Sequence, residues 1–307
     1  MTAPTTRPGS GTAGVPLLEV RDLQVGVPGR DGPLALVHGL SFAVDAGRTL
    51  GIVGESGSGK SMTSLAIMGL LPPGATASGS VRLRTQRHPE GEELLSAGAG
   101  RLRGLRGDRM AMIFQDPLSC LNPYYRVGVQ VAEAHRVHRG SSRRQARALA
   151  VDVLGRVGIP RPHQRVDDYP YQFSGGMRQR IMIAMSLVCE PDLLIADEPT
   201  TALDVTVQAQ ILALLSDLQR EFGTGMIYIT HDLAVVSQVA EDILVLREGR
   251  PVEHGPAEQI FSDPQQDYTR ELLDAVPRID DPVPAPHLQG GTTPLRPPGT
   301  SWGGGTP

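Results

Sequence analysis

Short apolar runs alternate with longer amphipathic segments over most of the chain. The runs at 49–53, 110–114, 192–196 and 226–230 are five residues long and carry almost no charge, which favours strands buried on both faces. Residues 60–71, which stop at Pro72, and residues 207–222 instead have a helical spacing of apolar positions. Strands that alternate with helices predict an α/β fold with a largely parallel sheet.

Pairs of strands are predicted at both ends of this alternating region. Residues 17–23 and 34–44 are apolar-rich and are separated by a turn at 28–33, so an antiparallel β part precedes the parallel core. Residues 243–247 and 251–254 predict a second hairpin around Gly249.

A helical insertion is predicted at about residues 118–190. Within it, Ser141 or Ser142 caps a helix that ends at Gly158. The apolar face of that helix comprises Ala146, Leu149, Ala150, Val153, Leu154 and Val157. Residues 74–109 are rich in Gly and Arg, and only 81–83 within them read as a strand.

Composition narrows the class of protein. The net charge of −4 lacks the basic excess of a general nucleic-acid binder, so we expect no nucleic-acid partner. No apolar run approaches the roughly 18 residues that span a bilayer. Residues 1–16 and 280–307 are rich in Pro, Gly and Thr and are expected to be disordered. Cys120 and Cys189 lack metal-ligand spacing, which favours a reducing cytoplasm.

Lysine is nearly absent, since 28 of the 29 basic residues are Arg and Lys60 is the only lysine. Coding bias explains why lysine is rare but not why it survives here. Lys60 belongs to a run that fits G-x-x-x-x-G-K-[ST] between a predicted strand and a predicted helix, the context that a phosphate loop requires. The run and the residue after it are Gly54, Glu55, Ser56, Gly57, Ser58, Gly59, Lys60, Ser61 and Met62.

A phosphate loop wraps its ligand with backbone amides and the N-terminus of the following helix. Lys60 would reach the β- and γ-phosphates and Ser61 would hold Mg²⁺. The alternative is a Gly-rich turn that fits the pattern by accident. The motif thus predicts a ligand with β- and γ-phosphates, bound together with Mg²⁺. The sequence also predicts a P-loop NTPase core with a largely parallel sheet, an N-terminal antiparallel β part and an inserted helical subdomain.

Two acids follow the apolar run at 192–196. Because an acid at the end of a buried strand is costly unless it meets a cation, Asp197 is predicted to bind Mg²⁺ directly or through water. Glu198 is next along the chain and is predicted to orient and deprotonate the attacking water. The alternative is a pair of acids that open an ordinary turn before Pro199.

The order of the motifs carries a resemblance to a known family. After the phosphate loop come Gln115, a capped helix start at 173–179, the acids at 197–198, the Ala-Leu-Asp at 202–204 and finally His231. Taken alone, the helix start is a plain capped helix and His231 a solvated loop histidine. In this order they resemble ABC-type ATPases over about residues 17–255.

The resemblance implies roles for these residues. Two such domains would pack head to tail, with ATP between the phosphate loop of one and the 173–179 helix of the other. Gln115 would line the Mg²⁺ and water site, His231 would contact the γ-phosphate, and Asp204 would lie at the dimer seam. The residues that serve the opposite subunit's ATP would be Ser174, Gly175, Gly176 and Gln179.

One part of the family's pattern is missing. The aromatic that stacks on adenine would be expected near Val27, and Phe42 is the only aromatic before Gly54. We therefore expect adenine recognition to be weak or nonspecific.

Further segments resemble the peptide and nickel importer branch of the family, in particular the first of its two paired ATPases. They lie at 112–117, 121–123, 183–185, 190–192, 200–210 and 267–277. The last departs from the branch by having Gln266-Asp267 in place of His-Pro. The ATPase domain is placed at 17–257 and a C-terminal extension at 258–279. With no cysteine after Cys189, no iron–sulfur cluster is predicted.

This branch implies a subunit that powers import of dipeptides, oligopeptides or a related solute such as nickel. Its partners would be a paralogous ATPase or a second copy, two transmembrane permeases and an extracytoplasmic binding protein. The chain would then lie at the cytoplasmic face of the membrane. Two alternatives fit the sequence less well. A soluble ABC ATPase usually has two ATPase domains or a long coiled-coil insertion, and we find neither pattern here. A P-loop kinase would give no role to the 173–179 helix or to His231.

Overall fold

The computed structural model describes residues 15–29, 32–85, 88–201 and 203–275. Most of the two predicted disordered ends lies outside these residues. The strands are β1 (Leu18–Gly29), β2 (Gly32–Val44), β3 (Thr49–Val53), β4 (Thr76–Thr85), β5 (His88–Glu93), β6 (Met110–Ile113), β7 (Leu193–Asp197), β8 (Gly225–Thr230), β9 (Asp242–Arg247) and β10 (Arg250–Pro256).

The helices alternate with these strands. They are α1 (Lys60–Met68), α2 (Ala99–Leu105), α3 (Pro117–Cys120), α4 (Val127–Arg139), α5 (Arg143–Arg156), α6 (Pro162–Arg165), the 3-10 turn η1 (Pro170–Gln172), α7 (Gly175–Leu187), α8 (Val205–Phe222), α9 (Leu233–Val236), α10 (Ala257–Ser262) and α11 (Asp267–Asp274).

A six-stranded sheet forms the centre of the fold, in the order β10-β9-β3-β8-β7-β6. Its pairs are parallel except for the antiparallel β9–β10 hairpin. Every residue of β3, β6, β7 and β8 is buried. Continuous burial is what parallel strands covered on both faces require, so the four short apolar runs were correctly interpreted.

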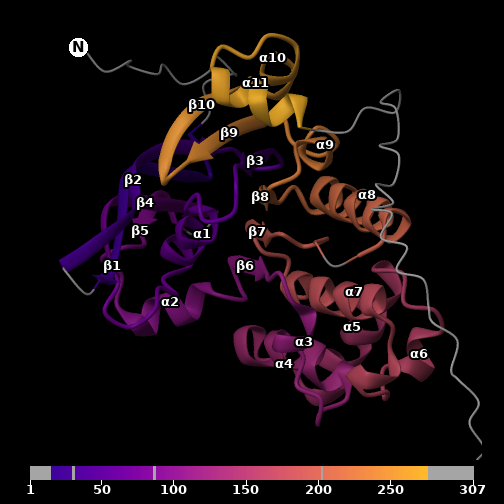
Figure 1. Cartoon of the computed structure of the whole chain (residues 1–307). Coiled ribbons are helices and arrows are strands. Elements are labelled where there is room, and N and C mark those ends of the chain that lie inside the picture. Colours follow the sequence, from indigo (N-terminus) through magenta and orange to yellow (C-terminus); the bar gives the residue numbers. More distant parts are fainter. Residues whose placement is uncertain (1–14, 30–31, 86–87, 202, 276–307) are drawn as a thin grey trace, which may run out of the picture. The chain divides into compact units, whose positions relative to one another are not determined.

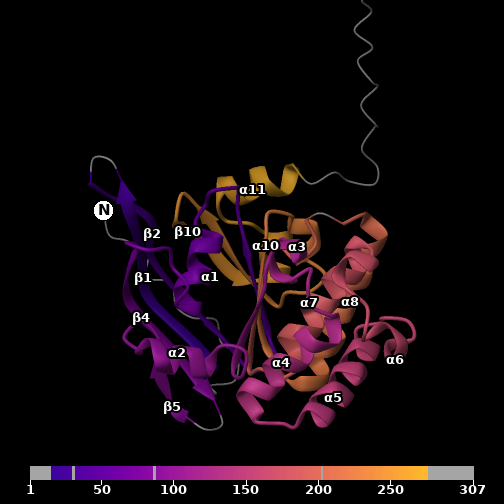
Figure 2. The ribbon, with the colours of Figure 1, turned by 90° about the horizontal axis from the view of Figure 1, so that it is seen from below.

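The two faces of this sheet belong to two hydrophobic cores. On β8, Met226 and Tyr228 pack into one core, and Ile227 and Ile229 pack into the other. This split follows from the alternation of side chains along a strand. The first core joins the sheet to the helices α4, α5, α7 and α8, and the second joins it to α1, α2 and the antiparallel sheet, as Figures 1 and 2 show from two directions.

The N-terminal sheet is antiparallel, in the order β2-β1-β4-β5. It confirms the predicted antiparallel part. Within residues 74–109 the predicted strand at 81–83 is confirmed as part of β4, but the full length of β4 and the elements β5 and α2 were not predicted. β5 is an edge strand without a buried residue, and the first half of β4 is polar and largely exposed. Strands that bury so little have no apolar pattern to recognise.

Five helices and the turn η1 lie between β6 and β7, which accounts for the predicted helical insertion. Ser142, one of the two serines offered as a cap, begins α5 with a reciprocal capping box: its Oγ accepts from the backbone N–H of Gln145, and the Gln145 side chain accepts from the Ser142 N–H. Together with the central and antiparallel sheets, this insertion confirms the predicted fold class.

Other predicted bounds need correction. α1 ends at Met68 rather than Leu71, because Gly69 adopts φ 63° and its N–H turns back to the carbonyl of Ala66. The short helices α9 and α10 and the C-terminal α11 were not predicted as helices. They have four, six and eight residues, too few for a helical period to stand out.

Candidate active site

The predicted site residues converge because of the strand order. The phosphate loop follows β3, Glu198 follows β7, His231 follows β8 and Gln115 lies two residues after β6. These four strands are neighbours in the order β3-β8-β7-β6 and run parallel. Their carboxyl ends therefore meet at one edge, where parallel α/β sheets bind ligands.

The loop 54–61 fits closely against the surrounding backbone. Gly54 has φ 154°, and a Cβ at this position would meet the carbonyl of Leu246 at 2.1 Å. Gly59 has φ 93°, and its Cβ would meet the carbonyl of Leu36 at 2.8 Å. Both glycines are thus required by contact and by conformation. The Met62 side chain packs against the core, so only its backbone is placed to serve a ligand.

Lys60 folds back over its own loop. Its Nζ donates to the carbonyls of Gly54 and Glu55, each at 2.7 Å, and to Ser58 Oγ at 3.3 Å. The residue is only 5% exposed. Burial lowers the pKa of its ammonium, and the nearby Glu198 and Asp197 partly oppose that shift. The ammonium is therefore held by geometry in the concave loop rather than left in solvent.

Asp197 and Ser61 form the oxygen-rich part of the site. Ser61 Oγ donates to Asp197 Oδ1 at 3.2 Å. Asp197 is 8% exposed, and this burial raises the pKa of its carboxyl, against the lowering effects of Ser61 and Lys60. A hydroxyl beside a buried carboxylate is the ligand pair that Mg²⁺ prefers, so these residues fit the metal that the sequence predicts.

Glu198 lies at the centre of the remaining polar groups. Gln115 Nε2 donates to Glu198 Oε2 at 3.0 Å, and His231 Nδ1 lies 3.3 Å from Oε1. Thr201 Oγ1 also donates to Oε2 at 3.0 Å. Glu198 adopts φ 47°, a left-handed conformation that is strained for a non-glycine residue and is often found at functional sites. The structure thus brings two sequence-predicted residues, Gln115 and His231, to the carboxylate of a third, Glu198.

Thr201 was missed by sequence reasoning. Its position three residues after Glu198 is the usual spacing for a hydroxyl that closes a tight turn, and that was the available signal. Leu272 was missed as well. It comes from α11 and lines a recess with Glu55, Ser56, Glu198 and His231.

The residues assigned to the opposite subunit lie at the start of α7. Ser174 is its N-cap, with Oγ accepting from the Met177 N–H at 3.4 Å. A Cβ on Gly175 would meet nothing within 4 Å, whereas one on Gly176 would meet Val207 at 2.7 Å. Within the described residues, no hydrogen bond joins this helix end to the phosphate loop.

Gln179 and Asp204, the other two residues predicted to serve the dimer, have different surroundings in this chain. Gln179 is 1% exposed, and its Nε2 has no hydrogen-bond partner within the described part of the chain. Asp204 is the N-cap of α8, accepting from the Val207 N–H at 2.9 Å. Ala202 lies outside the described residues. These contacts neither require nor oppose a role at a dimer seam.

The structure also places the residues considered for adenine recognition. Val27 lies on β1 opposite Leu34 and is half-buried. Phe42 is 5% exposed and belongs to the second core, so it offers no free ring face. Neither residue supplies a stacking platform.

A phosphate loop that faces carboxylates on neighbouring strand ends defines an ATPase of the phosphate-loop class. Comparison with known proteins places the chain more narrowly. The profile of the ABC transporter family matches residues 37–201. A second profile, described as the oligopeptide/dipeptide transporter C-terminal region, matches residues 252–299. The chain belongs to the ABC transporter family, as an ATP-hydrolysing subunit.

Its curated relatives include two oligopeptide transport ATP-binding proteins, both named OppD. That of Haemophilus influenzae is 49% identical over 265 residues, which cover 86% of this chain and 80% of the relative. That of Salmonella typhimurium is 50% identical over 264 residues, covering 86% and 77%. A putative peptide import ATP-binding protein of Brucella melitensis is 47% identical over 268 residues, covering 87% and 79%.

Solved structures agree on the fold. The ATP-binding cassette MJ0796, solved as a dimer in a post-hydrolysis state with ADP and Pi, gives a TM-score of 0.68 at 24% identity and covers 78% of this chain and 98% of its own. At that identity the likeness concerns the fold alone. The structure of cbiO1 from Clostridium perfringens, part of the ABC transporter complex cbiONQ, gives a TM-score of 0.64 at 27% identity and covers 81% of this chain and 91% of its own. No helix in the described residues is long and apolar enough to cross a membrane.

Proposed function

We propose that the chain binds and hydrolyses ATP to power import of oligopeptides or dipeptides through an ABC transporter. The observation that carries the proposal is the Glu198 carboxylate, which lies beside the phosphate loop within hydrogen-bond reach of Gln115 and His231. The relatives' names, which specify oligopeptide transport and peptide import, support the cargo class.

In this proposal the chain's residues divide the work of phosphoryl transfer to water. Lys60 and the amides of residues 54–62 hold the phosphates, and Ser61, Asp197 and Gln115 hold Mg²⁺, which when bound neutralises charge on the phosphate oxygens. Glu198 accepts a proton from the water that attacks the γ-phosphorus, and the bond to the β-phosphate oxygen breaks. His231 contacts the γ-phosphate oxygens and is held in place by Glu198.

The second half of the site comes from another ATPase subunit, a paralogue or a second copy of the chain. Ser174, Gly175, Gly176 and Gln179 would complete the partner's nucleotide site, and Asp204 would lie at the seam. The open space beside Gly175 and the N-terminal position of these amides on α7 support this assignment. The remaining partners are two permeases, which would hold the chain at the cytoplasmic membrane face, and an extracytoplasmic binding protein.

The proposed domain bounds are those given by the sequence. The ATPase domain spans 17–257 and the importer-type extension 258–279, with the helical subdomain at about 118–190.

The cysteines, Cys189 buried and Cys120 half-buried, are proposed to pack as small apolar residues, and burial raises the pKa of both thiols.

Peptide uptake by whole cells tests the transport function. Cells that lack this chain's gene are expected to lose uptake of a labelled oligopeptide down to background. The parent chain should restore uptake, and a Lys60→Ala variant expressed at the same level should not. If deletion leaves oligopeptide and dipeptide uptake unchanged, the chain serves another cargo or none, as a soluble ABC ATPase would.

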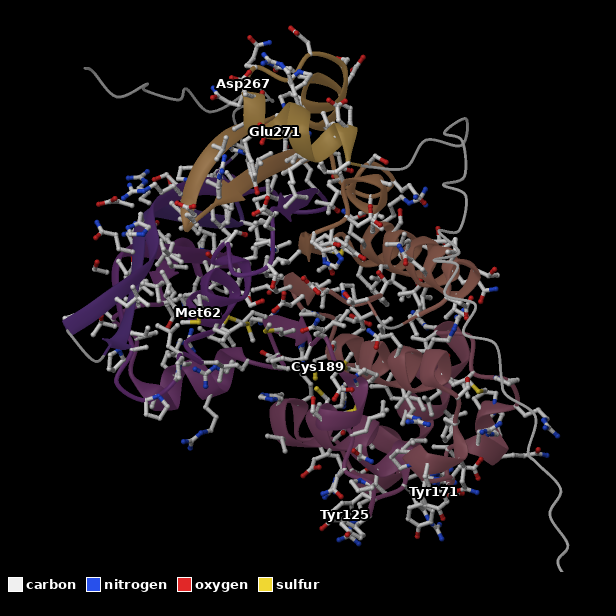
Figure 3. The ribbon with its side chains drawn as sticks, viewed as in Figure 1. Met62, Tyr125, Tyr171, Cys189, Asp267 and Glu271 are labelled. Atoms are coloured by element: carbon white, nitrogen blue, oxygen red, sulfur yellow. The ribbon has the colours of Figure 1, made fainter. Side chains whose placement is uncertain are left out.

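The loop before α4 is the proposed contact with a permease. Tyr124 is 85% exposed and Tyr125 is 56% exposed, so neither is a core residue, whereas Leu121 is 3% exposed and belongs to the core. The Gln130 side chain bonds the backbone of Asn122 twice and that of Tyr125 once, at 2.9–3.0 Å, which holds the loop rigid. Figure 3 shows Tyr125 and the exposed Tyr171 at the same end of the helical part.

Charged substitutions on this loop are expected to uncouple transport from hydrolysis. Exposed aromatic side chains on a rigid loop are typical anchors of an interface. In the assembled importer, Tyr124→Glu or Tyr125→Glu should reduce peptide uptake at least about tenfold, the effect of losing roughly 1.4 kcal/mol of contact, while the chain still hydrolyses ATP.

The matched control is Val137→Glu, since Val137 is 70% exposed and lies about three turns along α4 from Val127. This variant should transport as the parent does. Normal transport by correctly assembled Tyr124→Glu and Tyr125→Glu variants would remove the loop from the docking role.

A further inference from the structure

The C-terminal helix α11 is strongly two-sided. Asp267, Arg270, Glu271 and Asp274 are exposed, whereas Tyr268 and Thr269 are buried and Leu272 and Leu273 pack against the first core. Figure 3 shows the labelled Asp267 and Glu271 on this helix. Such a pattern is expected of a helix that packs one face on the domain beneath it.

The inward face of α11 contacts the phosphate loop directly. Tyr268 is 6% exposed, and its Oη accepts a hydrogen bond from the backbone N–H of Glu55 at 3.4 Å. Glu55 is the second residue of the loop, and its carbonyl accepts from Lys60 Nζ at 2.7 Å. The same peptide segment therefore lies between the Tyr268 hydroxyl and the Lys60 ammonium.

The phenol ring of Tyr268 also contacts the β9–β10 hairpin, which has its own contacts with the loop. The Arg247 guanidinium lies over the Tyr268 ring at 4.7 Å. The neighbouring Leu246 carbonyl is the group that presses on Gly54, and the Gly249 N–H donates to the Ser58 carbonyl at 3.0 Å. Both the β9–β10 hairpin and α11 therefore contact the loop, and the Arg247 side chain joins these two elements.

The next turn of α11 reaches the hydrolytic end of the site. Leu272 lines the recess formed with Glu55, Ser56, Glu198 and His231. Four residues separate it from Tyr268, so the two side chains lie on the same face of the helix. One helix therefore borders both the loop that binds phosphate and the glutamate proposed as base.

We propose that Tyr268 is a positioning residue for the phosphate loop and that α11 is an integral wall of the nucleotide site. The Tyr268 hydroxyl fixes the Glu55 peptide, and that peptide fixes the starting position of Lys60. This inference rests on the proposed function, because Tyr268 acts through the site that binds ATP. It gives the segment matched by the transporter C-terminal profile, which includes α11, a direct part in nucleotide binding.

A purely structural role for α11 would give a different outcome. If Tyr268 only docked the helix, its loss would lower stability and leave nucleotide affinity unchanged. The substitution Tyr268→Phe separates the two roles, since it keeps the ring, the core packing and the Arg247 contact and removes only the hydroxyl.

The matched control is Thr269→Val on the same helix. Thr269 is fully buried, and its Oγ1 has no hydrogen-bond partner among the described residues. The change deletes a neighbouring buried hydroxyl of the same helix without touching the loop, and it keeps the side-chain shape.

The experiment measures the Kd and KM for Mg-ATP, kcat and the melting temperature of the full-length variants. For Tyr268→Phe we expect a Kd and KM about two- to fourfold higher, as for the loss of one hydrogen bond, with kcat at saturating ATP unchanged. The larger change Tyr268→Leu should raise the Kd further, and Thr269→Val should match the parent.

Parental Kd and KM in Tyr268→Phe would overturn the positioning role, as would an equal rise in Thr269→Val. Lys60→Ala distinguishes this failure from failure of the proposed function. If Lys60→Ala loses ATP binding while Tyr268→Phe keeps parental affinity, only the role of Tyr268 is wrong. If Lys60→Ala binds Mg-ATP as the parent does, the nucleotide site itself has been misassigned.

Discussion

The substitution Glu198→Gln is expected to lower ATP turnover at least about a hundredfold while ATP binding persists. The amide keeps the size of the side chain and can still accept from Gln115 and Thr201, but it cannot take a proton from water. With hydrolysis blocked and binding intact, a closed ATP-bound dimer should accumulate. Steady-state phosphate release by the assembled importer, together with gel filtration in Mg-ATP, measures both effects.

A matched control exists for this substitution. Glu190 shares the left-handed backbone of Glu198, at φ 50°, but it is exposed and lies outside the site. Glu190→Gln should therefore turn over ATP at the parental rate. Near-normal turnover by Glu198→Gln would show that another group takes the proton.

Lys60→Arg is expected to lose most nucleotide binding although it keeps the charge. The Lys60 ammonium occupies a buried position 2.7 Å from two backbone carbonyls, and the loop around it is held by the close approach of Gly54 to Leu246. A guanidinium is a wide planar fork and does not fit where a compact ammonium does. We expect the affinity for Mg-ATP to fall at least about tenfold, or roughly 1.4 kcal/mol.

The comparison that isolates geometry from charge is Arg220→Lys on α8. Arg220 is exposed and pairs with Asp217 within its own helix, so the exchange should leave ATP affinity unchanged. Isothermal titration of the folded proteins provides the measurement. An unchanged affinity in Lys60→Arg would mean that the loop needs only a positive charge at this position.

Sequence reasoning succeeded where burial is continuous. The four apolar runs predicted β3, β6, β7 and β8 within one or two residues at each end, because a strand covered on both faces leaves a run without charge. Since these strands are parallel neighbours, their ends carry Gln115, Glu198, His231 and the phosphate loop to one edge. The apolar runs and the order of the motifs therefore already contained the information that these residues lie close together.

Sequence reasoning failed where residues are held by contacts that are distant in the chain. β5 is a polar edge strand that depends on its pairing with β4. The hydrogen bond from the Glu55 N–H to Tyr268 joins residues separated by 213 positions. No local sequence pattern specifies such a contact. Only the structure therefore shows that α11 contributes to the site.

The most direct test of the central claim, that residues 54–61 bind the phosphates of ATP, uses the only lysine. An amine-directed reagent has two targets in the untagged chain, Lys60 and the N-terminal amine. Burial lowers the pKa of Lys60, which increases the share of the reactive free amine at alkaline pH. Mass spectrometry should show that Mg-ATP reduces labelling of Lys60 and leaves labelling of the N-terminus unchanged. Labelling of Lys60 that is the same with and without Mg-ATP would contradict the phosphate-loop assignment.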